Sequence, residues 1–134
     1  MLHSFTVATN AGQELCDISR RVQGLVADSG ISRGLCFILV PHTTAGITIN
    51  ENADPDVGRD ILAHLERMVP QDGDYRHREG NSPAHIKASL MGSQQVVPID
   101  GGRLALGTWQ GIYLCEFDGP RRRTVTVKLL PDAS

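Results

Sequence analysis

The stretch that decides the fold is GLCFILVPHTTAGITINENADPD, residues 34–56. It contains the longest apolar run of the chain, Leu35 to Val40, which predicts a buried strand. A second strand is predicted from Ala45 to Ile49. Asp54-Pro55 then has the chemistry of a helix start, a carboxylate cap followed by proline. A turn rich in capping residues would explain each polar group in between, but the cluster as a whole favours a functional site.

Turn residues and apolar spacing predict the other elements. The apolar residues Phe5 and Val7 on one side, and Leu15 to Ile18 on the other, flank the turn Asn10-Ala11-Gly12, which suggests an opening hairpin. Capping residues and helical periodicity predict three helices, which begin at Ser19, Pro55 and Asn81-Ser82-Pro83 and end near Gly30, Pro70 and Gly92. Strand-like runs predict four further strands, at 95–99, 103–106, 112–117 and 124–130.

The order of these elements indicates the fold class. Helices and strands are mixed without strict alternation, and the last four elements are all strands. This order favours an α+β fold over a doubly wound one. We therefore predict a single domain, residues 1–134, in which a mostly antiparallel β-sheet packs against helices.

Composition excludes several classes of protein. The net charge of −2 over 134 residues gives no electrostatic footprint for nucleic acid or for an anionic membrane. No apolar stretch approaches the roughly 18 residues of a membrane helix. The three cysteines are far apart in apolar runs, which is typical of buried thiols in a reducing compartment. We expect a cytoplasmic protein.

Three blocks of the sequence carry a resemblance to a known family. The blocks are HTTAGI, NEN and DPDV within residues 42–57, GNSPAHIKA at residues 80–88, and GTWQGI with EFDGPR within residues 107–121. Together they resemble the YjbQ family, described as secondary thiamine-phosphate synthase enzymes. The resemblance runs from about Phe5 to Leu130, and the blocks occur in the family's order and spacing.

The resemblance has implications for fold, assembly and chemistry. It implies an α+β fold that assembles as a homotrimer. It also implies a weak or secondary activity that joins a hydroxymethylpyrimidine diphosphate to a thiazole phosphate and releases pyrophosphate. The expected partner is therefore a small phosphorylated substrate.

Three histidines in motifs that match the family, His42, His77 and His85, are candidate metal ligands. Imidazole is the commonest metal ligand and a proton shuttle near neutral pH. We expect His77 and His85 to face one pocket, because they lie just before and just inside the third helix. Their spacing matches no standard zinc signature. A bound divalent ion, Mg²⁺ or Zn²⁺, is one interpretation, and surface or core side chains are the other.

Acidic side chains suit the chemistry of diphosphate departure. Mg²⁺ is usually held by one or two protein carboxylates together with substrate phosphates. Glu116 and Asp118 end an apolar strand, where alternation places both on the same face. With Glu51 they are the predicted catalytic residues. Asp54 has a competing role as a helix cap.

Candidates for substrate binding come from two regions. The helix start at Asn81 and Ser82 offers free backbone N–H groups and the positive end of a helix dipole. Arg121 and Arg123 would project the same way from a strand and grip a phosphate, although a solvated face or a subunit salt bridge would also explain them. The remaining predicted substrate contacts are Thr43, Thr44 and Trp109.

Three functional interpretations stay open at this point. The first is a transferase that acts on phosphorylated heterocycles, in which Trp109 stacks on a ring rather than packing against the core or a neighbouring subunit. The second is a metal-dependent hydrolase in which a histidine-bound metal activates water. The third is a non-catalytic trimer that binds small anions. The sequence contains no nucleophile elbow, P-loop or dinucleotide fingerprint that would decide among them.

Overall fold

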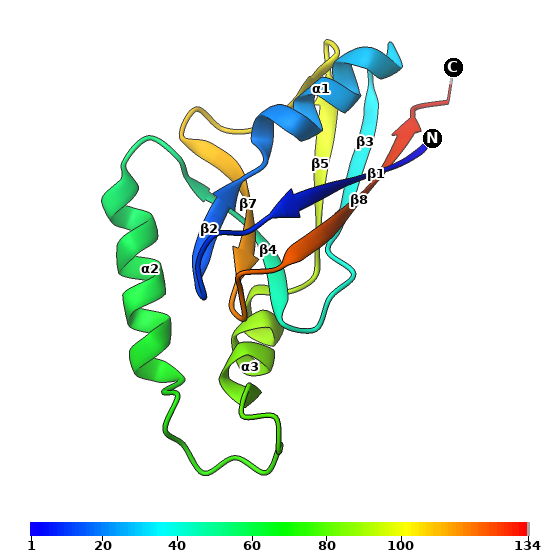
Figure 1. The fold of residues 1–134 in the computed structure, drawn as a ribbon. Helices are drawn as coiled ribbons and strands as arrows, with labels where there is room; N and C mark the ends of the chain where they lie inside the picture. The colour runs from blue at the N-terminus through cyan, green and yellow to red at the C-terminus, as the bar shows by residue number, and fades with distance from the viewer. Residues whose placement is uncertain (134) are drawn as a thin grey trace.

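Two antiparallel sheets and three helices make up residues 1–133, the part of the chain that the computed structural model describes (Figure 1). The five-stranded sheet has the order β1-β8-β3-β5-β6, and the three-stranded sheet has the order β2-β7-β4. The strands are β1 (Leu2–Ala8), β2 (Glu14–Asp17), β3 (Gly34–Leu39), β4 (Ala45–Glu51), β5 (Gln94–Asp100), β6 (Arg103–Leu104), β7 (Gln110–Glu116) and β8 (Arg122–Pro131). The helices are α1 (Ser19–Ser29), α2 (Pro55–Met68) and α3 (Ser82–Met91).

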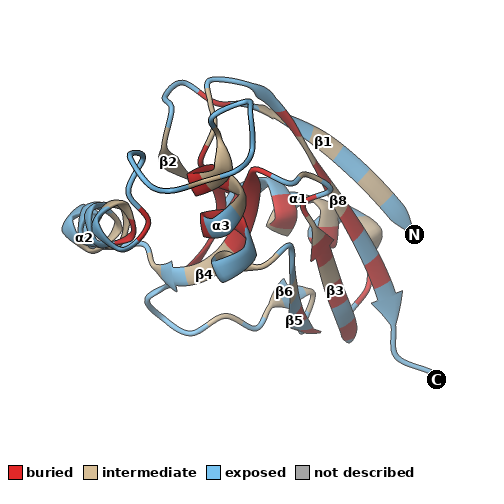
Figure 2. Cartoon of the chain, turned by 90° about the horizontal axis from the view of Figure 1, so that it is seen from below, coloured by how far each residue is buried: buried red, intermediate tan, exposed pale blue. Residues whose placement is uncertain are grey.

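The main core joins the inner faces of both sheets to α1. Figure 2 shows the alternation along β8, where buried and less buried residues succeed one another. Residues from β3, β7 and β8 are almost completely buried together with Val22 and Val26 of α1. The longest apolar run thus forms a strand inside the sheet, with β8 on one side and β5 on the other. The predicted α+β architecture is confirmed.

A second core lies on the opposite face of the three-stranded sheet. There Leu65 of α2 and Ala84 and Ala88 of α3 pack against Cys115 and Phe117 at the end of β7. Helix α3 also approaches β4 closely, because a Cβ atom on Gly46 would lie only 2.8 Å from the Gly92 carbonyl oxygen. This close packing fixes α3 beside the end of β4 where the loop from β3 arrives.

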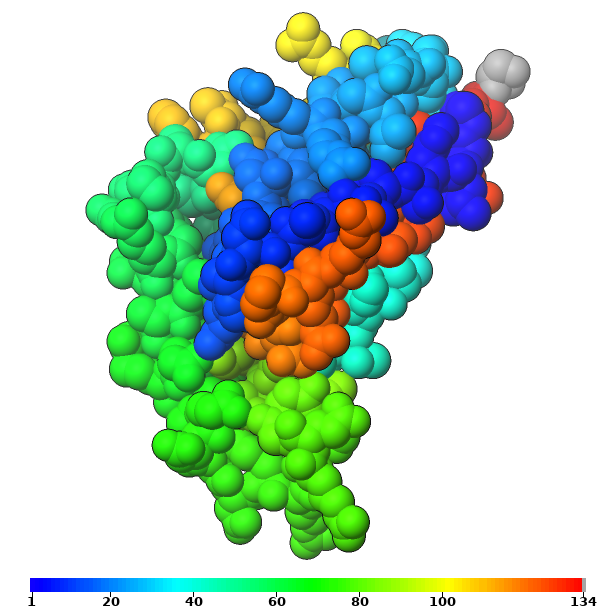
Figure 3. Space-filling view, in the orientation of Figure 1, coloured from blue at the N-terminus to red at the C-terminus, as the bar shows by residue number. Residues whose placement is uncertain are grey.

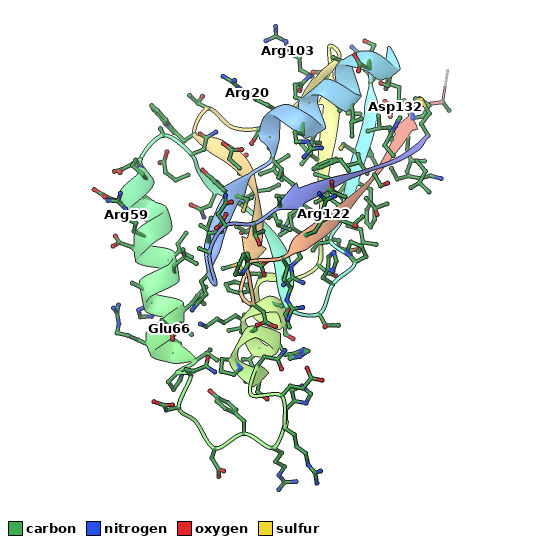
Figure 4. All side chains as sticks on the ribbon, viewed as in Figure 1. Arg20, Arg59, Glu66, Arg103, Arg122 and Asp132 are labelled. Carbon is green, nitrogen blue, oxygen red and sulfur yellow. The ribbon has the colours of Figure 1, made fainter. Side chains whose placement is uncertain are left out.

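A buried lysine ties α3 to α2. Lys87, only 2 % exposed, donates hydrogen bonds to Glu66 of α2 and, at 2.8 Å, to Gln13 in the loop between β1 and β2. Hydrogen bonds from Lys87 and Gln13 lower the pKa of Glu66, which is labelled on α2 in Figure 4. The contact holds three segments of the chain together on the side of α3 that faces α2.

The N-terminal cap agrees with the prediction at one helix and differs from it at the other two. At α2 the prediction is confirmed, because the Asp54 carboxylate accepts the N–H of Asp56 and Pro55 opens the helix. Ser19 is not the cap of α1: Ile18 occupies that position, and the Ser19 hydroxyl accepts the N–H of Ile112 instead. Asn81 stands at the cap of α3, but its side-chain amide donates to a carboxylate in the site described below.

The predicted opening hairpin is wrong. Strands β1 and β2 belong to different sheets, with β1 paired to β8 and β2 paired to β7. The turn residues after β1 were read correctly as a break, but each strand finds its partner from the far end of the chain. Tertiary pairing, which local sequence does not encode, decided this part of the topology.

The outer face of the five-stranded sheet is apolar and bare. No helix within residues 1–133 covers it, and a hollow there is lined mainly by leucine, valine and phenylalanine side chains. Leu35 on β3, Val96 on β5 and Leu130 on β8 are each between 43 % and 52 % exposed. A contiguous exposed apolar face is a feature of interaction surfaces.

Two further expectations concern the cysteines and the membrane. The described part of the chain contains no helix that is both long enough and apolar enough to span a bilayer. Cys36 and Cys115 are buried free thiols, as predicted, while Cys16 is partly buried. Burial raises the pKa of Cys36 to about 11 and that of Cys115 to about 12, so both thiols stay protonated at neutral pH.

Candidate functional site

A polar cavity of about 460 Å³ lies between the start of α3, the β3–β4 loop and the β7–β8 connection. This volume is in the range of small-molecule sites. Its walls hold nine of the predicted site residues. The lining residues are Pro41, His42, Thr43, Thr44, His77, Glu79, Asn81, His85, Asp118, Arg121 and Arg123.

Two more hollows adjoin this cavity. One, of about 510 Å³, runs along α3 and shares His42, Thr43 and His85 with it. The other contains Ser82 and shares His77 and His85. It is bordered by the loop before α3, which forms the lower end of the molecule in Figure 3. His85 lines all three hollows, so a ligand larger than one phosphate group has room around this side chain.

The cavity wall is built on a buried ion pair between Arg123 and Glu116. Arg123 is 4 % exposed and Glu116 is completely buried. Arg123 Nε donates to Glu116 Oε1 at 2.9 Å, and Nη2 contacts the second carboxylate oxygen. The same Nη2 reaches the Thr44 hydroxyl at 2.9 Å and its carbonyl oxygen at 3.1 Å. Arg123 therefore joins β8, β7 and the β3–β4 loop at the edge of the cavity.

Glu116 is held as a carboxylate by its surroundings. Burial by itself would raise its pKa, but hydrogen bonds from Arg123, the Asp118 N–H and Thr9, together with the charge of Arg123, outweigh burial. The resulting pKa lies below the ordinary value. Thr9 Oγ1 also accepts the Arg121 N–H at 2.8 Å, so the end of β1 takes part in this network. Glu116, a predicted catalytic residue, lies behind Arg123 and orients it.

A second acidic group, Asp118, faces the cavity. Its Oδ2 atom accepts the Asn81 side-chain amide at 3.0 Å and Arg121 Nη2 at 3.0 Å. Arg121 Nε also donates to the Asp118 carbonyl oxygen at 2.7 Å. The predicted residues Asn81, Asp118 and Arg121 thus form one connected group, although Asn81 and Arg121 are 40 positions apart in the chain. Arg122, labelled in Figure 4, is exposed and lies outside the cavity lining.

His42 is anchored through one ring nitrogen. The backbone N–H of Thr124 on β8 donates to His42 Nε2 at 2.9 Å. A nitrogen that accepts a hydrogen bond carries no proton, so the neutral ring carries its proton on Nδ1. Burial of the ring and the nearby charge of Arg123 lower the pKa of His42. The side chain is therefore neutral at physiological pH, and its Nδ1–H is a hydrogen-bond donor.

The three predicted metal ligands do not form one ligand set. His77 and His85 meet edge to face, with ring centroids 5.4 Å apart, and His77 Nε2 lies 3.8 Å from Glu79 Oε2. His42 directs Nε2 toward Thr124 and carries its proton on Nδ1. Within residues 1–133, no three His, Cys, Asp or Glu side chains are placed to hold a metal ion. The donor set does not fit a resident metal bound by the three histidines.

Glu51 and Trp109 lie away from the cavity. Glu51 ends β4, whereas Thr44 precedes its first residue, so the length of the strand, about 20 Å, separates them. The Glu51 carboxylate accepts the N–H of Ala53. Trp109 is 64 % exposed, and its carbonyl oxygen accepts the N–H of Asn52 at the same far end. The sequence placed these residues in family motifs, but the motifs occupy opposite ends of β4 and β7.

Two residues of the site, Glu79 and Thr9, were not predicted from the sequence. Glu79 lines the cavity from a loop whose composition only indicated exposure. Thr9 supports the cavity from the end of β1 through its contacts with Glu116 and Arg121. Its role depends on the pairing of β1 with β8, which local patterns did not predict. A polar residue at the end of an alternating strand was the only available hint.

Comparison with known proteins places the chain in a family. It matches the family model described as "UPF0047 protein YjbQ-like" over residues 3–132. The UPF0047 protein YugU of Bacillus subtilis is 50 % identical over 131 residues, which are 97 % of this chain and 99 % of the relative. The UPF0047 protein MJ1081 of Methanocaldococcus jannaschii is 49 % identical over 132 residues, 98 % of this chain and 96 % of the relative.

Solved structures agree with this relationship. A crystal structure of a YjbQ/UPF0047 family protein from Clostridium acetobutylicum has a TM-score of 0.94 at 56 % identity, covering 96 % of this chain and 99 % of that chain. A YbjQ-like protein from Sulfolobus solfataricus has the same TM-score at 36 % identity, covering 98 % and 97 %. The chain belongs to the YjbQ-like UPF0047 family.

Proposed function

We propose that the cavity binds phosphorylated substrates and supports weak, secondary thiamine-phosphate synthase-like transfer. In this reaction a hydroxymethylpyrimidine diphosphate is joined to a thiazole phosphate, and pyrophosphate is released. The observation that carries the proposal is the connected group of Asn81, Asp118 and Arg121 beside the anchored guanidinium of Arg123. The family resemblance, which implies this chemistry, supports it.

The charges of the cavity suit a diphosphate that arrives with a cation. Arg121 is paired with Asp118, and Arg123 is paired with Glu116, so neither guanidinium is a free positive charge. A bare diphosphate would meet the carboxylate of Asp118 as well as the arginines. A diphosphate that carries Mg²⁺ would offer its oxygens to the arginines and its metal to the carboxylate. The proposal thus treats the divalent ion as part of the substrate.

The reaction requires stabilisation of the departing diphosphate. A bond forms between the thiazole nitrogen and the methylene carbon of the pyrimidine while the bond from that carbon to the diphosphate oxygen breaks. Negative charge develops on the departing diphosphate. Preorganised donors directed at that charge lower the barrier, and one such contact commonly contributes on the order of 3 kcal/mol, or roughly a hundredfold in rate. In the proposal, Arg121 and Arg123 supply these contacts and Asp118 orients Arg121.

Turnover with purified precursors tests this proposal. The wild type should form thiamine phosphate slowly in Mg²⁺. Asp118→Asn and Arg121→Ala should each lower the rate by about a hundredfold while circular dichroism stays unchanged. Arg122→Ala is the matched control, since Arg122 is exposed outside the cavity, and should keep the wild-type rate. Unchanged rates in both cavity variants would place the chemistry elsewhere. Absence of product with Mg²⁺, Mn²⁺ and Zn²⁺ alike would contradict the transferase assignment.

We also propose that the chain assembles as a homotrimer, as the family resemblance implies. The bare apolar face of the five-stranded sheet supports this, because monomers seldom leave such a face in water. Light scattering at micromolar concentration should give three subunit masses. Val96→Lys, on the exposed face of β5, should reduce the assembly to smaller species. A single subunit mass for the wild type would contradict the trimer.

A further inference from the structure

The ring of His42 has one anchored nitrogen and one free nitrogen. Nε2 accepts the backbone N–H of Thr124 at 2.9 Å, and Nδ1 makes no hydrogen bond within residues 1–133. The ring lines both the main cavity and the hollow along α3. A histidine in this setting has one proton to offer, and the anchor decides which nitrogen holds it.

The hydrogen bond from the Thr124 N–H fixes both the ring orientation and the neutral tautomer of His42. Turning the ring by 180° would place a carbon atom, with its C–H, against the Thr124 N–H. Moving the proton to Nε2 would bring two N–H donors together. Both alternatives lose a hydrogen bond and leave a partly buried backbone donor without an acceptor. The Nδ1–H tautomer is the only neutral form that satisfies Thr124.

The groups beside His42 indicate which kind of ligand the ring would bind. Arg123 lines the cavity next to it, and Nη1 of this guanidinium makes no hydrogen bond within the described residues, while Nε and Nη2 are engaged. Thr43, whose side chain carries a hydroxyl donor, lines the same two hollows as His42. Three donors therefore border one space, and one of them belongs to a guanidinium. This surrounding favours an anionic oxygen and disfavours a metal cation.

We propose that His42 is a substrate-binding residue whose Nδ1–H donates to an anionic phosphoryl oxygen, and that it is not a ligand of a resident metal. The inference rests on the diphosphate cavity proposed above and names the group that recognises the ligand there. It assigns Thr124 a positioning role, because its backbone N–H fixes the tautomer. The motif HTTAGI then contributes a fixed neutral donor to the site.

Binding of inorganic pyrophosphate, measured calorimetrically on the full chain with Mg²⁺ present, tests this directly. His42→Phe keeps a ring but removes the donor, and should weaken binding by about tenfold to a hundredfold. His42→Asn places an amide N–H₂ near the Nδ1 position and should weaken it only a few-fold. His64→Phe, an exposed histidine on α2, is the control and should bind as the wild type does.

Nitrogen NMR of labelled histidine provides the second readout, which does not require activity. His42 should show a protonated Nδ1 and an unprotonated Nε2, and pyrophosphate should shift Nδ1 more than Nε2. Equal affinity of all variants, or a protonated Nε2, would overturn the inference. Zn²⁺ that binds at Nδ1 and displaces pyrophosphate would also overturn it. Pyrophosphate affinity that depends on His42 without any turnover would support the inference while refuting the transferase proposal.

Discussion

Replacing Glu116 with Gln perturbs the buried pair that holds Arg123 at the cavity wall. Glu116 is completely buried and Arg123 is 4 % exposed, so neither charge is solvated in the folded protein. The substitution keeps the volume of the side chain and one acceptor oxygen. It removes the negative charge, and the guanidinium then stays buried beside a neutral amide. The thermodynamic cost therefore reports on the charge rather than on packing.

The expected loss of stability is about 3 kcal/mol. Removing one partner of a buried ion pair typically costs 3–5 kcal/mol, and the remaining hydrogen bonds to the amide oxygen place this case near the lower limit. Asp100→Asn is a matched control, since Asp100 and its partner Arg33 are 75 % and 76 % exposed. Solvent screening should hold the cost of the control below about 1 kcal/mol. Urea unfolding at fixed protein concentration, followed by circular dichroism, measures both.

The pH dependence has a definite sign. The pKa of Glu116 is lower in the folded protein than its ordinary value of 4.5, so its contribution to stability is present above that value and is lost as pH falls through the folded pKa. The difference between wild type and Glu116→Gln should therefore be constant above about pH 5 and shrink in more acidic solution. A difference below about 1 kcal/mol at neutral pH, or one that grows on acidification, would refute the buried-pair reasoning.

Two further predictions concern packing around α3. Lys87→Met should destabilise the fold by about 2 kcal/mol in urea unfolding, because the charge-assisted hydrogen bonds to Glu66 and Gln13 are lost; an unchanged midpoint would contradict this role. Gly46→Ala should cost about 1–3 kcal/mol, since its Cβ would lie 2.8 Å from the Gly92 carbonyl oxygen. Gly24→Ala in α1 has open space and should instead stabilise by about 0.5–1 kcal/mol, and equal effects of the two alanines would contradict the packing argument.

Local sequence was sufficient for most elements of the fold and insufficient for strand pairing. The apolar run in residues 34–40 and the Asp54-Pro55 start of α2 were predicted correctly, because burial and capping act within a few residues. The opening hairpin was wrong, since β1 and β2 each pair with a strand more than 90 residues away. Ser19 was misread as a cap because its hydroxyl is used by a backbone N–H from β7.

The sequence predicted most of the residues of the site but only part of their spatial arrangement. Asn81, Asp118 and Arg121 were chosen for their chemistry, and the structure brings them together. Glu51 and Trp109 belong to similar motifs but lie at the far end of the three-stranded sheet, which no spacing argument could show before the strand order was known. The tautomer of His42 depends on a backbone donor 82 positions away and required the structure.

A crystal structure of the protein with Mg²⁺ and pyrophosphate tests the central claim most directly. The account predicts pyrophosphate in the cavity, with oxygens within hydrogen-bond distance of His42 Nδ1 and Arg121, and Mg²⁺ on the Asp118 side. Pyrophosphate bound beside Trp109 at the opposite end of the sheet would contradict the claim. So would an unchanged, ligand-free cavity in crystals grown at saturating pyrophosphate.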